Sequence, residues 1–322
     1  MVRQGGNTDR RVRVTAHSAS PRATERLAVL AALAAALACV VGGAGIVAMR
    51  ALVAETDPIT VAYLRNGIGA VVLLMLALVT CRRPVGRRDL LVMAAIGLVS
   101  FGVYQWMMAF ALQYTTAGRA AVTMSVMPFM TLAIASFAGL ERPSRRKLVG
   151  LVLASSGVAI ALWKDATIAD AAWRGDVVVL AASLVAAAAA VASTRYVRRY
   201  PPLMFVAAGL VPTSLALWAV RAANGTPELL PTLSTNGWIA AIWLGLAGAV
   251  VSYFLWHWAL RHTTPTLVSV SITLNPVTAL VLGAVVLGEE VTVGLLVGLA
   301  AVFAGIIVAN SRRRGPVAGA EH

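Results

Sequence analysis

The chain has 322 residues, of which 59% are hydrophobic and 12% are charged, and its mean hydropathy is +0.82. A soluble domain carries about 25% charged residues, so this composition excludes a soluble protein and indicates a membrane protein. The net charge of +14 would suit nucleic-acid binding, but the basic residues lie in short clusters between apolar runs, without interleaved aromatics, and predict no nucleic-acid partner.

Ten apolar runs follow a polar, basic tail over residues 1–25, which we expect to be disordered. Crossing about 30 Å of hydrocarbon takes about 20 apolar residues. The first run exceeds the apolar core of a signal peptide and no convincing cleavage site follows it, so we expect it to be retained. The predicted spans are 27–49, 58–80, 90–113, 118–139, 148–163, 176–195, 203–222, 238–260, 265–287 and 291–309. The alanine-rich sixth run gives the weakest signal.

One segment of the chain occurs twice, at 111–161 and again at 259–309, with a constant offset of 148 positions and no gap. Apolar composition alone does not bring prolines and glycines into register, so we interpret the chain as two duplicated halves. The paired residues include Thr115 and Thr263, Pro128 and Pro276, Glu141 and Glu289, Gly150 and Gly298, and Gly157 and Gly305. The predicted organisation is a tail over 1–25, repeats over 26–163 and 174–310, and a tail over 311–322.

Basic residues are distributed unequally between the two sides of the membrane. In the predicted topology, 21 of the 27 Lys and Arg residues fall on the side of the two termini, which places both termini in the cytoplasm. Because each half has five spans, the second half enters from the opposite face. The predicted fold is therefore an all-α polytopic protein of the inner or plasma membrane, with ten transmembrane helices in two inverted five-helix repeats.

Short motifs recur at equivalent places in both halves. ALQYTTA at 111–117 matches ALRHTTP at 259–265, and each is followed by a span with a central proline, then a glutamate, then a span with two glycines seven residues apart. With Arg65 in the second span, this pattern resembles the EamA family of the drug/metabolite transporter superfamily, whose members carry two such repeats in ten spans. LGEE at 287–290 is close to the family's LGE, whereas GLE at 139–141 and VGGAG at 41–45 depart from its pattern. The resemblance implies a secondary transporter and leaves the solute open.

Pro128 and Pro276 fall near the middle of the fourth and ninth predicted spans. A proline inside a helix removes one hydrogen bond and clashes with the carbonyl four residues earlier, here on Met124 and Ile272. A simple packing kink is one interpretation. Equivalent interruptions in both halves, however, are typical of the midplane site of a transporter, so we predict a helix-break or gating role and a cavity between these two spans.

Polar, aromatic and methionine side chains of the third, fourth, eighth and ninth predicted spans are the candidate substrate-binding residues. Tyr104 and Tyr253 lie deep in their spans, where they can stack and form hydrogen bonds. The amide of Asn275 cannot be satisfied within its own helix, whereas Ser and Thr can bond their own helix carbonyls, which leaves a structural role equally open for them. The predicted set is Tyr104, Gln105, Met108, Thr123, Met127, Tyr253, Trp256, Ser271 and Asn275.

Two further residues carry a possible charge or proton role. Arg65 is the only basic residue well inside a predicted span, and either a structural role or the binding of an anionic group would explain it. His257 is the only histidine within the predicted spans and either snorkels to the interface or handles protons. Arg119 is expected to anchor the start of its span. No Asp or Glu lies at the centre of any predicted span, so the sequence does not support proton coupling.

We expect a secondary transporter that moves a small metabolite, amino-acid-like or drug-like solute by alternating access, with efflux favoured by the resemblance alone. An uptake permease or nucleotide-sugar-like exchanger is the alternative, and a non-transporting membrane scaffold is a more distant one. We expect no enzyme, because the predicted spans contain no carboxylate pair and a single histidine. Cys39 and Cys81 form no CxxC or Cys/His group, so neither a metal site nor a cofactor is predicted. The expected partners are the lipid bilayer and the solute.

Overall fold

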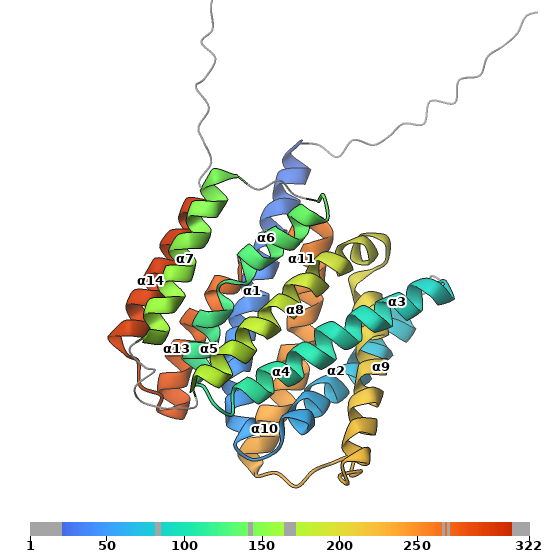
Figure 1. Cartoon of the computed structure of the whole chain (residues 1–322). Coiled ribbons are helices and arrows are strands. Elements are labelled where there is room, and N and C mark those ends of the chain that lie inside the picture. The colour runs from blue at the N-terminus through green and yellow to red at the C-terminus, as the bar shows by residue number, and fades with distance from the viewer. Residues whose placement is uncertain are drawn as a thin grey trace, which may run out of the picture.

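The computed structural model describes residues 21–80, 85–140, 144–163, 172–265, 268 and 271–310, and this part of the chain folds into helices without a β-strand (Figure 1). Residues 1–20 and 311–322 of the predicted tails lie outside the described residues, as do Cys81 and Glu141. Helix α1 begins at Pro21, so residues 21–25 belong to a helix and not to a disordered tail. Proline suits a first helical position because its missing N–H would have no partner there.

The helices of the first half follow the apolar runs closely. Thr116 caps one of them by accepting a hydrogen bond from the Arg119 amide, and Gly139, with φ of 71°, lies just beyond the end of another. The elements are α1 (Pro21–Val53), α2 (Pro58–Thr80), α3 (Arg87–Gly97), η1 (Leu98–Val103), α4 (Tyr104–Ala111), α5 (Ala117–Met124), α6 (Met127–Phe137) and α7 (Arg145–Trp163).

The second half repeats this plan. Ser234 caps its third helical segment through the Gly237 amide, and Gly288, with φ of 67°, lies just after α13. The elements are α8 (Ala172–Arg199), α9 (Pro202–Ala223), α10 (Thr235–Trp243), η2 (Leu244–Val251), α11 (Ser252–His262), η3 (Ser271–Thr273), α13 (Leu274–Leu287) and α14 (Val293–Asn310).

Seven stretches of the described residues are helical, long and apolar enough to cross a membrane. They are Val29–Val53, Pro58–Thr80, Arg87–Ala111, Ala117–Phe137, Ala172–Arg199, Pro202–Ala223 and Thr235–His262. The other three predicted spans correspond to the shorter apolar helices Leu148–Ala161, Leu274–Leu287 and Val293–Val308. The chain is thus an all-helical, multi-pass membrane protein.

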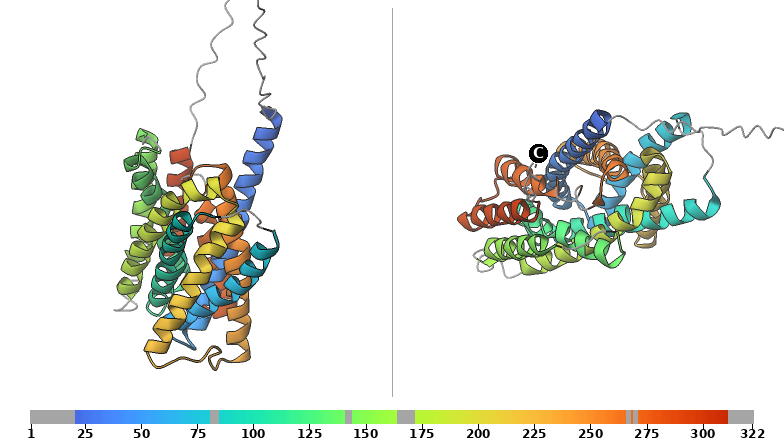
Figure 2. Two further views of the ribbon diagram at one scale, coloured as in Figure 1. Left: turned by 90° about the vertical axis from the view of Figure 1, so that its right-hand side faces the viewer. Right: turned by 90° about the horizontal axis from the view of Figure 1, so that it is seen from above.

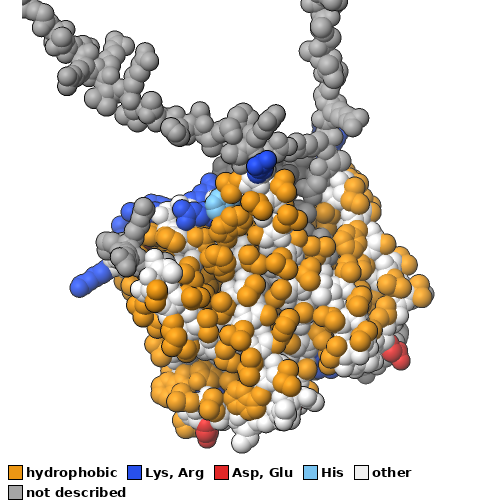
Figure 3. Space-filling view, turned by 180° about the vertical axis from the view of Figure 1, so that it is seen from behind, with side chains coloured by type: hydrophobic (Ala, Val, Ile, Leu, Met, Phe, Trp, Pro, Cys, Tyr) orange, Lys and Arg blue, Asp and Glu red, His pale blue; other side chains and the backbone are white. Residues whose placement is uncertain are grey.

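The outer surface has the character expected of a protein surrounded by lipid. Hydrophobic side chains cover the middle of the face shown in Figure 3, whereas Lys and Arg gather at one end and Asp and Glu lie at the opposite end. Phe137 is 94% exposed and Val285 is 77% exposed. Exposure of this extent is unfavourable in water but not in hydrocarbon.

Two spans that look continuous in the sequence are broken in the structure. Residues Ser125 and Val126 separate α5 from α6, so Pro128 is the second residue of a helix; Pro276 is the third residue of α13, directly after the short 3₁₀ turn η3. The prediction that these prolines interrupt a helix from within is therefore wrong in its local detail. In a first turn a proline costs no hydrogen bond, and the break lies ahead of it.

The third predicted span of each half contains a π-helical stretch that the sequence does not predict. Stretch η1 joins α3 to α4, and η2 joins α10 to α11 at the equivalent place in the second half. A π-helical turn inserts an extra residue into the helix and displaces the side chains around it. In both halves the π-helical stretch therefore changes which of the neighbouring side chains face the interior.

Helices of one half pack against helices of the other, and each such contact has an equivalent contact in which the two halves have changed places. Helix α1 contacts α11 and α13 of the second half, and α8 contacts α4 and α6 of the first. Helices α7 and α14 lie side by side at one edge of the molecule (Figures 1 and 2). A Cβ atom on Gly157 would lie 2.6 Å from the Gly298 carbonyl oxygen, and one on Gly305 would lie 2.6 Å from that of Gly150. Residue numbers rise along one helix as they fall along the other, so α7 and α14 run antiparallel. Each contact also becomes the other after a shift of 148 positions, so the two helices are related by an approximate two-fold axis.

Candidate solute-binding cavity

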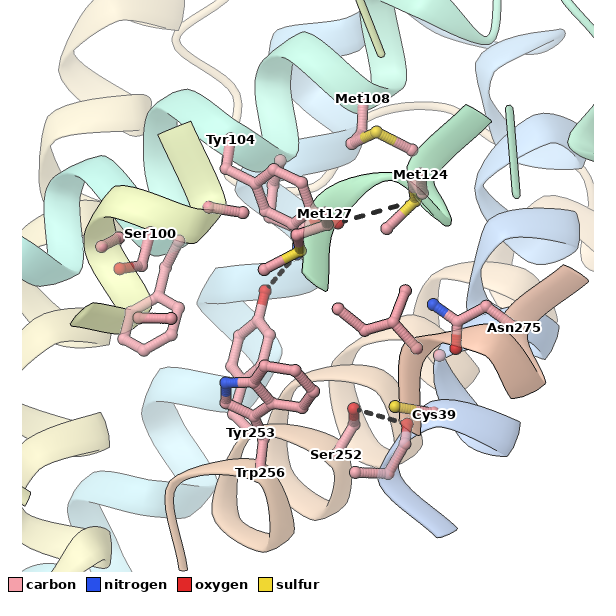
Figure 4. A pocket seen from close by; sticks show the side chains of 18 of the residues that line it. Cys39, Ser100, Tyr104, Met108, Met124, Met127, Ser252, Tyr253, Trp256 and Asn275 are labelled. Atoms are coloured by element: carbon pink, nitrogen blue, oxygen red, sulfur yellow. Dashed lines mark hydrogen bonds between the residues drawn. The ribbon is translucent and has the colours of Figure 1, made fainter. Parts of the chain in front are cut away.

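A cavity of about 140 Å³ lies in the interior, between helices of both halves. Figure 4 shows tyrosine, tryptophan and methionine side chains around it, with Asn275 and Cys39 on one side. Its lining residues are Ala38, Cys39, Gly42, Ile46, Met49, Arg65, Ser100, Phe101, Tyr104, Gln105, Met108, Met124, Met127, Ala186, Ala189, Ala190, Ser252, Tyr253, Trp256, His257, Ile272 and Asn275.

The two helix breaks border the cavity. Met124 and Met127 lie immediately before and after the break between α5 and α6, and Ile272 and Asn275 lie in and just after η3. A break lets side chains at neighbouring positions point into the same space, which a regular helix would spread around its axis. Both prolines are buried in the first turn of a helix and do not line the cavity. They contribute by shaping the backbone.

The Tyr253 hydroxyl accepts hydrogen bonds from two other side chains on the cavity wall. Gln105 Nε2 donates a hydrogen bond to it at 2.6 Å, and Arg65 Nε donates at 3.2 Å. Gln105 and Tyr253 are separated by 148 positions and are therefore equivalent residues of the two repeats. Equivalent residues that touch each other must lie close to the axis that relates the halves, so this part of the cavity is central.

Arg65 is 6% exposed and has no carboxylate partner among the described residues. Its Nη2 donates to the Gly248 carbonyl oxygen at 2.9 Å, and the guanidinium carbon lies 5.2 Å from the centre of the Tyr253 ring. A Cβ atom at Gly45 or Gly248 would come within 3.5 Å of the guanidinium. The two glycines therefore leave room for the charged group.

Asn275 has a buried side-chain oxygen without a partner among the described residues. The residue is 6% exposed, and its Oδ1 is shielded from solvent without accepting a hydrogen bond. A Cβ atom at Gly43 would lie 2.7 Å from the Asn275 carbonyl oxygen, so only glycine allows α1 to come this close to α13. A buried, unsatisfied amide costs free energy, and such groups occur where a ligand or water completes the hydrogen bonds.

His257 lies on the cavity wall, and its Nδ1 is 2.8 Å from the Tyr253 carbonyl oxygen of the same helix. Its ring packs against Phe101, at 5.7 Å between centroids, and against Phe205, at 5.0 Å. The side chain is thus held in the interior and does not snorkel to the membrane surface.

Most of the predicted site residues are brought together by the fold, but two are not. Tyr104, Gln105, Met108, Met127, Tyr253, Trp256 and Asn275 line the cavity, together with Arg65 and His257. Thr123 is fully buried away from it, and its hydroxyl donates to the Arg119 carbonyl oxygen of its own helix. Ser271 lies in η3 and is half-buried, outside the wall.

Several residues of the cavity wall were not predicted from the sequence, because they are neither polar nor close to the two prolines. Ala186, Ala189 and Ala190 come from the alanine-rich run that gave the weakest span signal, and Gly42 comes from VGGAG. These residues make the cavity by being small. The only sequence signal was a run of small residues inside a span, which is ambiguous because small residues also mark close helix packing.

Polar contacts at the end that carries the acidic loops connect the two halves. Glu289 accepts from the Ala117 amide at 3.0 Å and the Gly118 amide at 3.4 Å, so it stabilises the start of α5 in the other half. Arg119, predicted as a simple anchor, is buried in an ion pair with Asp176 at the start of α8. Thr115 also donates to Asp176, at 3.0 Å.

Two sections of the sequence match the EamA-like transporter family, over residues 29–163 and 173–311. The chain belongs to this family. Its members carry the repeat twice, which agrees with the exchangeable helix pairs and with the central contact between Gln105 and Tyr253.

Relatives of this EamA-like protein are transporters and not enzymes. A "Probable terminal-alkyne amino-acid exporter" of Streptantibioticus cattleyicolor is 30% identical over 247 residues, which cover 73% of this chain and 77% of that protein. An "Uncharacterized transporter" of Archaeoglobus fulgidus is 23% identical, over 84% and 95% of the two chains. A "Probable amino-acid metabolite efflux pump" of Salmonella typhimurium is 25% identical, over 65% and 73%.

A solved crystal structure has the same fold. It superposes with a TM-score of 0.66 and covers 88% of this chain and 96% of the other, at 18% sequence identity.

Proposed function

We propose that this EamA-like protein is a secondary transporter of the inner or plasma membrane that exports a small metabolite, amino-acid-like or drug-like solute by alternating access. The observation that carries the proposal is the interior cavity at the contact between equivalent residues Gln105 and Tyr253, next to the two helix breaks. A central site bordered by both repeats can be reached from either side when the halves rearrange. Efflux is supported by two relatives whose names describe an exporter and an efflux pump.

The proposed architecture is ten transmembrane helices in two inverted five-helix repeats, over 26–163 and 174–310. The antiparallel contact of α7 with α14 supports the inversion, because an axis that relates antiparallel helices runs across them and therefore along the membrane plane. The three shorter apolar helices would complete the count of ten. Charge supports both termini in the cytoplasm, since the exposed Arg88 and Arg198 lie at the start of α3 and the end of α8, whereas the exposed Glu55 and Glu228 lie in the loops after α1 and α9.

We assign solute contact to the cavity wall, with Tyr104, Gln105, Tyr253, Trp256 and Asn275 as the side chains that stack on or hydrogen-bond the solute. Met108 and Met127 would supply adaptable apolar contacts, since the flexible thioether chain fits bodies of different shape. Pro128 and Pro276 would fix the helix starts beside the cavity and so act on gating indirectly.

The test is an untargeted comparison of solutes inside and outside cells that express the intact protein, Asn275→Leu, or no protein. We expect one class of solutes to be depleted inside and enriched in the medium only with the intact protein. Asn275→Leu should reach the membrane in equal amount and lose most of this difference, because it removes an amide that lines the cavity without cutting any hydrogen bond within the protein.

Val285→Leu is the matched control, because Val285 lies on the same helix, is 77% exposed and is remote from the cavity wall. It should transport as the intact protein does. Uptake in place of export would reverse the proposed direction. No difference for any solute across a broad panel would favour a non-transporting scaffold.

A further inference from the structure

The interior cavity carries a fixed positive charge that the protein leaves unbalanced. Arginine stays protonated under all physiological conditions, so the guanidinium of Arg65 is a permanent cation. Cys39, Tyr104, Tyr253 and His257 are the other titratable side chains on the wall, and no Asp or Glu occurs among its described residues. Of the two other buried arginines, Arg119 is paired with Asp176, and Arg221 donates to the Thr60 hydroxyl and the Glu228 carbonyl oxygen outside the cavity wall.

The contacts that Arg65 does make are too weak to balance its charge. Within the described part of the chain it donates to one hydroxyl and one carbonyl oxygen, and it lies over one aromatic ring. These are neutral dipoles, and a buried ion without a counter-ion pays a large desolvation cost. Nη1 forms no hydrogen bond with any described residue, so the Nη1–Nη2 edge of the guanidinium still has N–H groups to donate.

The space beside the charge suits an anion with a soft, apolar body. Met49, Met108, Met124 and Met127 line the cavity with the aromatic rings of Phe101 and Trp256. Thioethers and aromatic rings make favourable contacts with apolar or aromatic groups, whereas a guanidinium edge binds carboxylate or phosphate oxygens with paired hydrogen bonds. The volume of about 140 Å³ is close to that of cavities that admit a benzene ring.

We propose that the solute carries an anionic group that binds the Nη1–Nη2 edge of Arg65, and that its apolar part lies against the methionine wall. This inference rests on the proposed transport function and specifies its substrate class. A neutral solute would leave the charge of Arg65 unbalanced, and a cationic solute would be repelled by it.

The test uses three probes of one shape: 3-phenylpropionate, 3-phenylpropanamide and 3-phenylpropylamine. Binding of each to the full-length protein in lipid nanodiscs is measured by titration calorimetry. We expect the carboxylate to bind at least about tenfold more tightly than the amide, in line with one charge-assisted hydrogen-bonded pair, and the amine to show no binding.

Substitutions locate the charge that is responsible. Arg65→Gln should abolish the preference for the carboxylate, and Arg65→Lys should keep part of it because the charge remains. Arg50→Gln is the matched control: Arg50 donates to the Leu112 carbonyl oxygen and does not line the cavity, so the preference should persist. The comparison of the three probes on the unmodified protein stands even where a variant fails to fold.

Repeating the titrations at low and at high chloride concentration distinguishes an organic anion from an inorganic one. A preference for the carboxylate at both concentrations supports the proposal, whereas equal binding of carboxylate and amide, or a preference that survives Arg65→Gln, overturns it. Strong competition by chloride with no discrimination among the probes would also overturn it, in favour of a resident inorganic ion. Export without carboxylate preference would refute this inference alone, and carboxylate binding without any export would refute the transport function alone.

Discussion

Two buried asparagines of this protein illustrate opposite uses of the same side chain. Asn66 is fully buried on α2, and its Nδ2 donates at 2.6 Å to the Phe101 carbonyl oxygen in the π-helical stretch η1. Both side-chain oxygens are buried without a partner among the described residues, but Asn275 has no bond like the one that Asn66 makes through Nδ2. One amide therefore satisfies the irregular backbone of the third span, and the other is left available beside the cavity.

This contrast predicts different effects on stability. Asn66→Leu should lower the melting temperature of the purified protein, by an amount that corresponds to about 1–3 kcal/mol, because a backbone carbonyl in apolar surroundings loses its donor. Asn275→Leu should leave the melting temperature unchanged or raise it, since a buried unsatisfied amide is removed. Thermal unfolding monitored by circular dichroism measures both. Equal destabilisation by the two substitutions would show that Asn275 has a partner within the folded protein.

The residue types at the site were predictable, but their exact membership was not. Tyr104, Tyr253 and Asn275 could be chosen because large polar side chains inside a span need a partner or a cavity. Thr123 and Ser271 were chosen for the same polarity, yet a hydroxyl can be satisfied by its own helix, as Thr123 is. Sequence cannot decide between these two uses, because the direction of a side chain depends on the neighbouring helix.

At the scale of elements, the α7–α14 pair depends on glycines that meet backbone to backbone. Gly157 and Gly305 occupy equivalent positions, and at each a Cβ atom would lie 2.6 Å from a carbonyl oxygen of the opposite helix. Neither residue lines the cavity. Their substitution therefore isolates helix packing from solute contact.

Gly157→Ala and Gly305→Ala should each destabilise the protein, by roughly 1–3 kcal/mol and to a similar extent, because both force the same two helices apart. Gly86→Ala is the control, since nothing lies within 4 Å of a Cβ atom there. Melting temperatures of the three variants provide the measurement. A large difference between Gly157→Ala and Gly305→Ala would contradict the two-fold relation of the pair.

Helix limits followed from the sequence where an apolar run ends at a clear signal. The second span was predicted at 58–80, and α2 covers Pro58–Thr80. The stretches η1 and η2 were not foreseeable, since a π-helical turn leaves the apolar run intact. The break before Pro128 was displaced by a few residues from its prediction, because proline fits a helix start better than a helix interior.

For the whole molecule, the orientation in the membrane is the property that charge predicts most directly. Arg88 at the start of α3 and Glu228 in the loop after α9 are both exposed. In a variant without Cys39 and Cys81, a single cysteine at Glu228 should react with a membrane-impermeant maleimide in intact cells. A single cysteine at Arg88 should react only after permeabilisation, since more basic loops stay in the cytoplasm. The opposite pattern would invert the proposed topology.

The hydrogen bond between Gln105 and Tyr253 has a consequence for the history of the chain. Before the duplication diverged, one residue type stood at both positions, and in a symmetric pair of half-length chains it would have faced its own copy. A perfectly symmetric site binds an asymmetric guest equally well in two opposite poses. Because Gln105 and Tyr253 now differ and Arg65 lies on one side only, the two ends of the cavity differ, and we expect a solute to bind in a single pose.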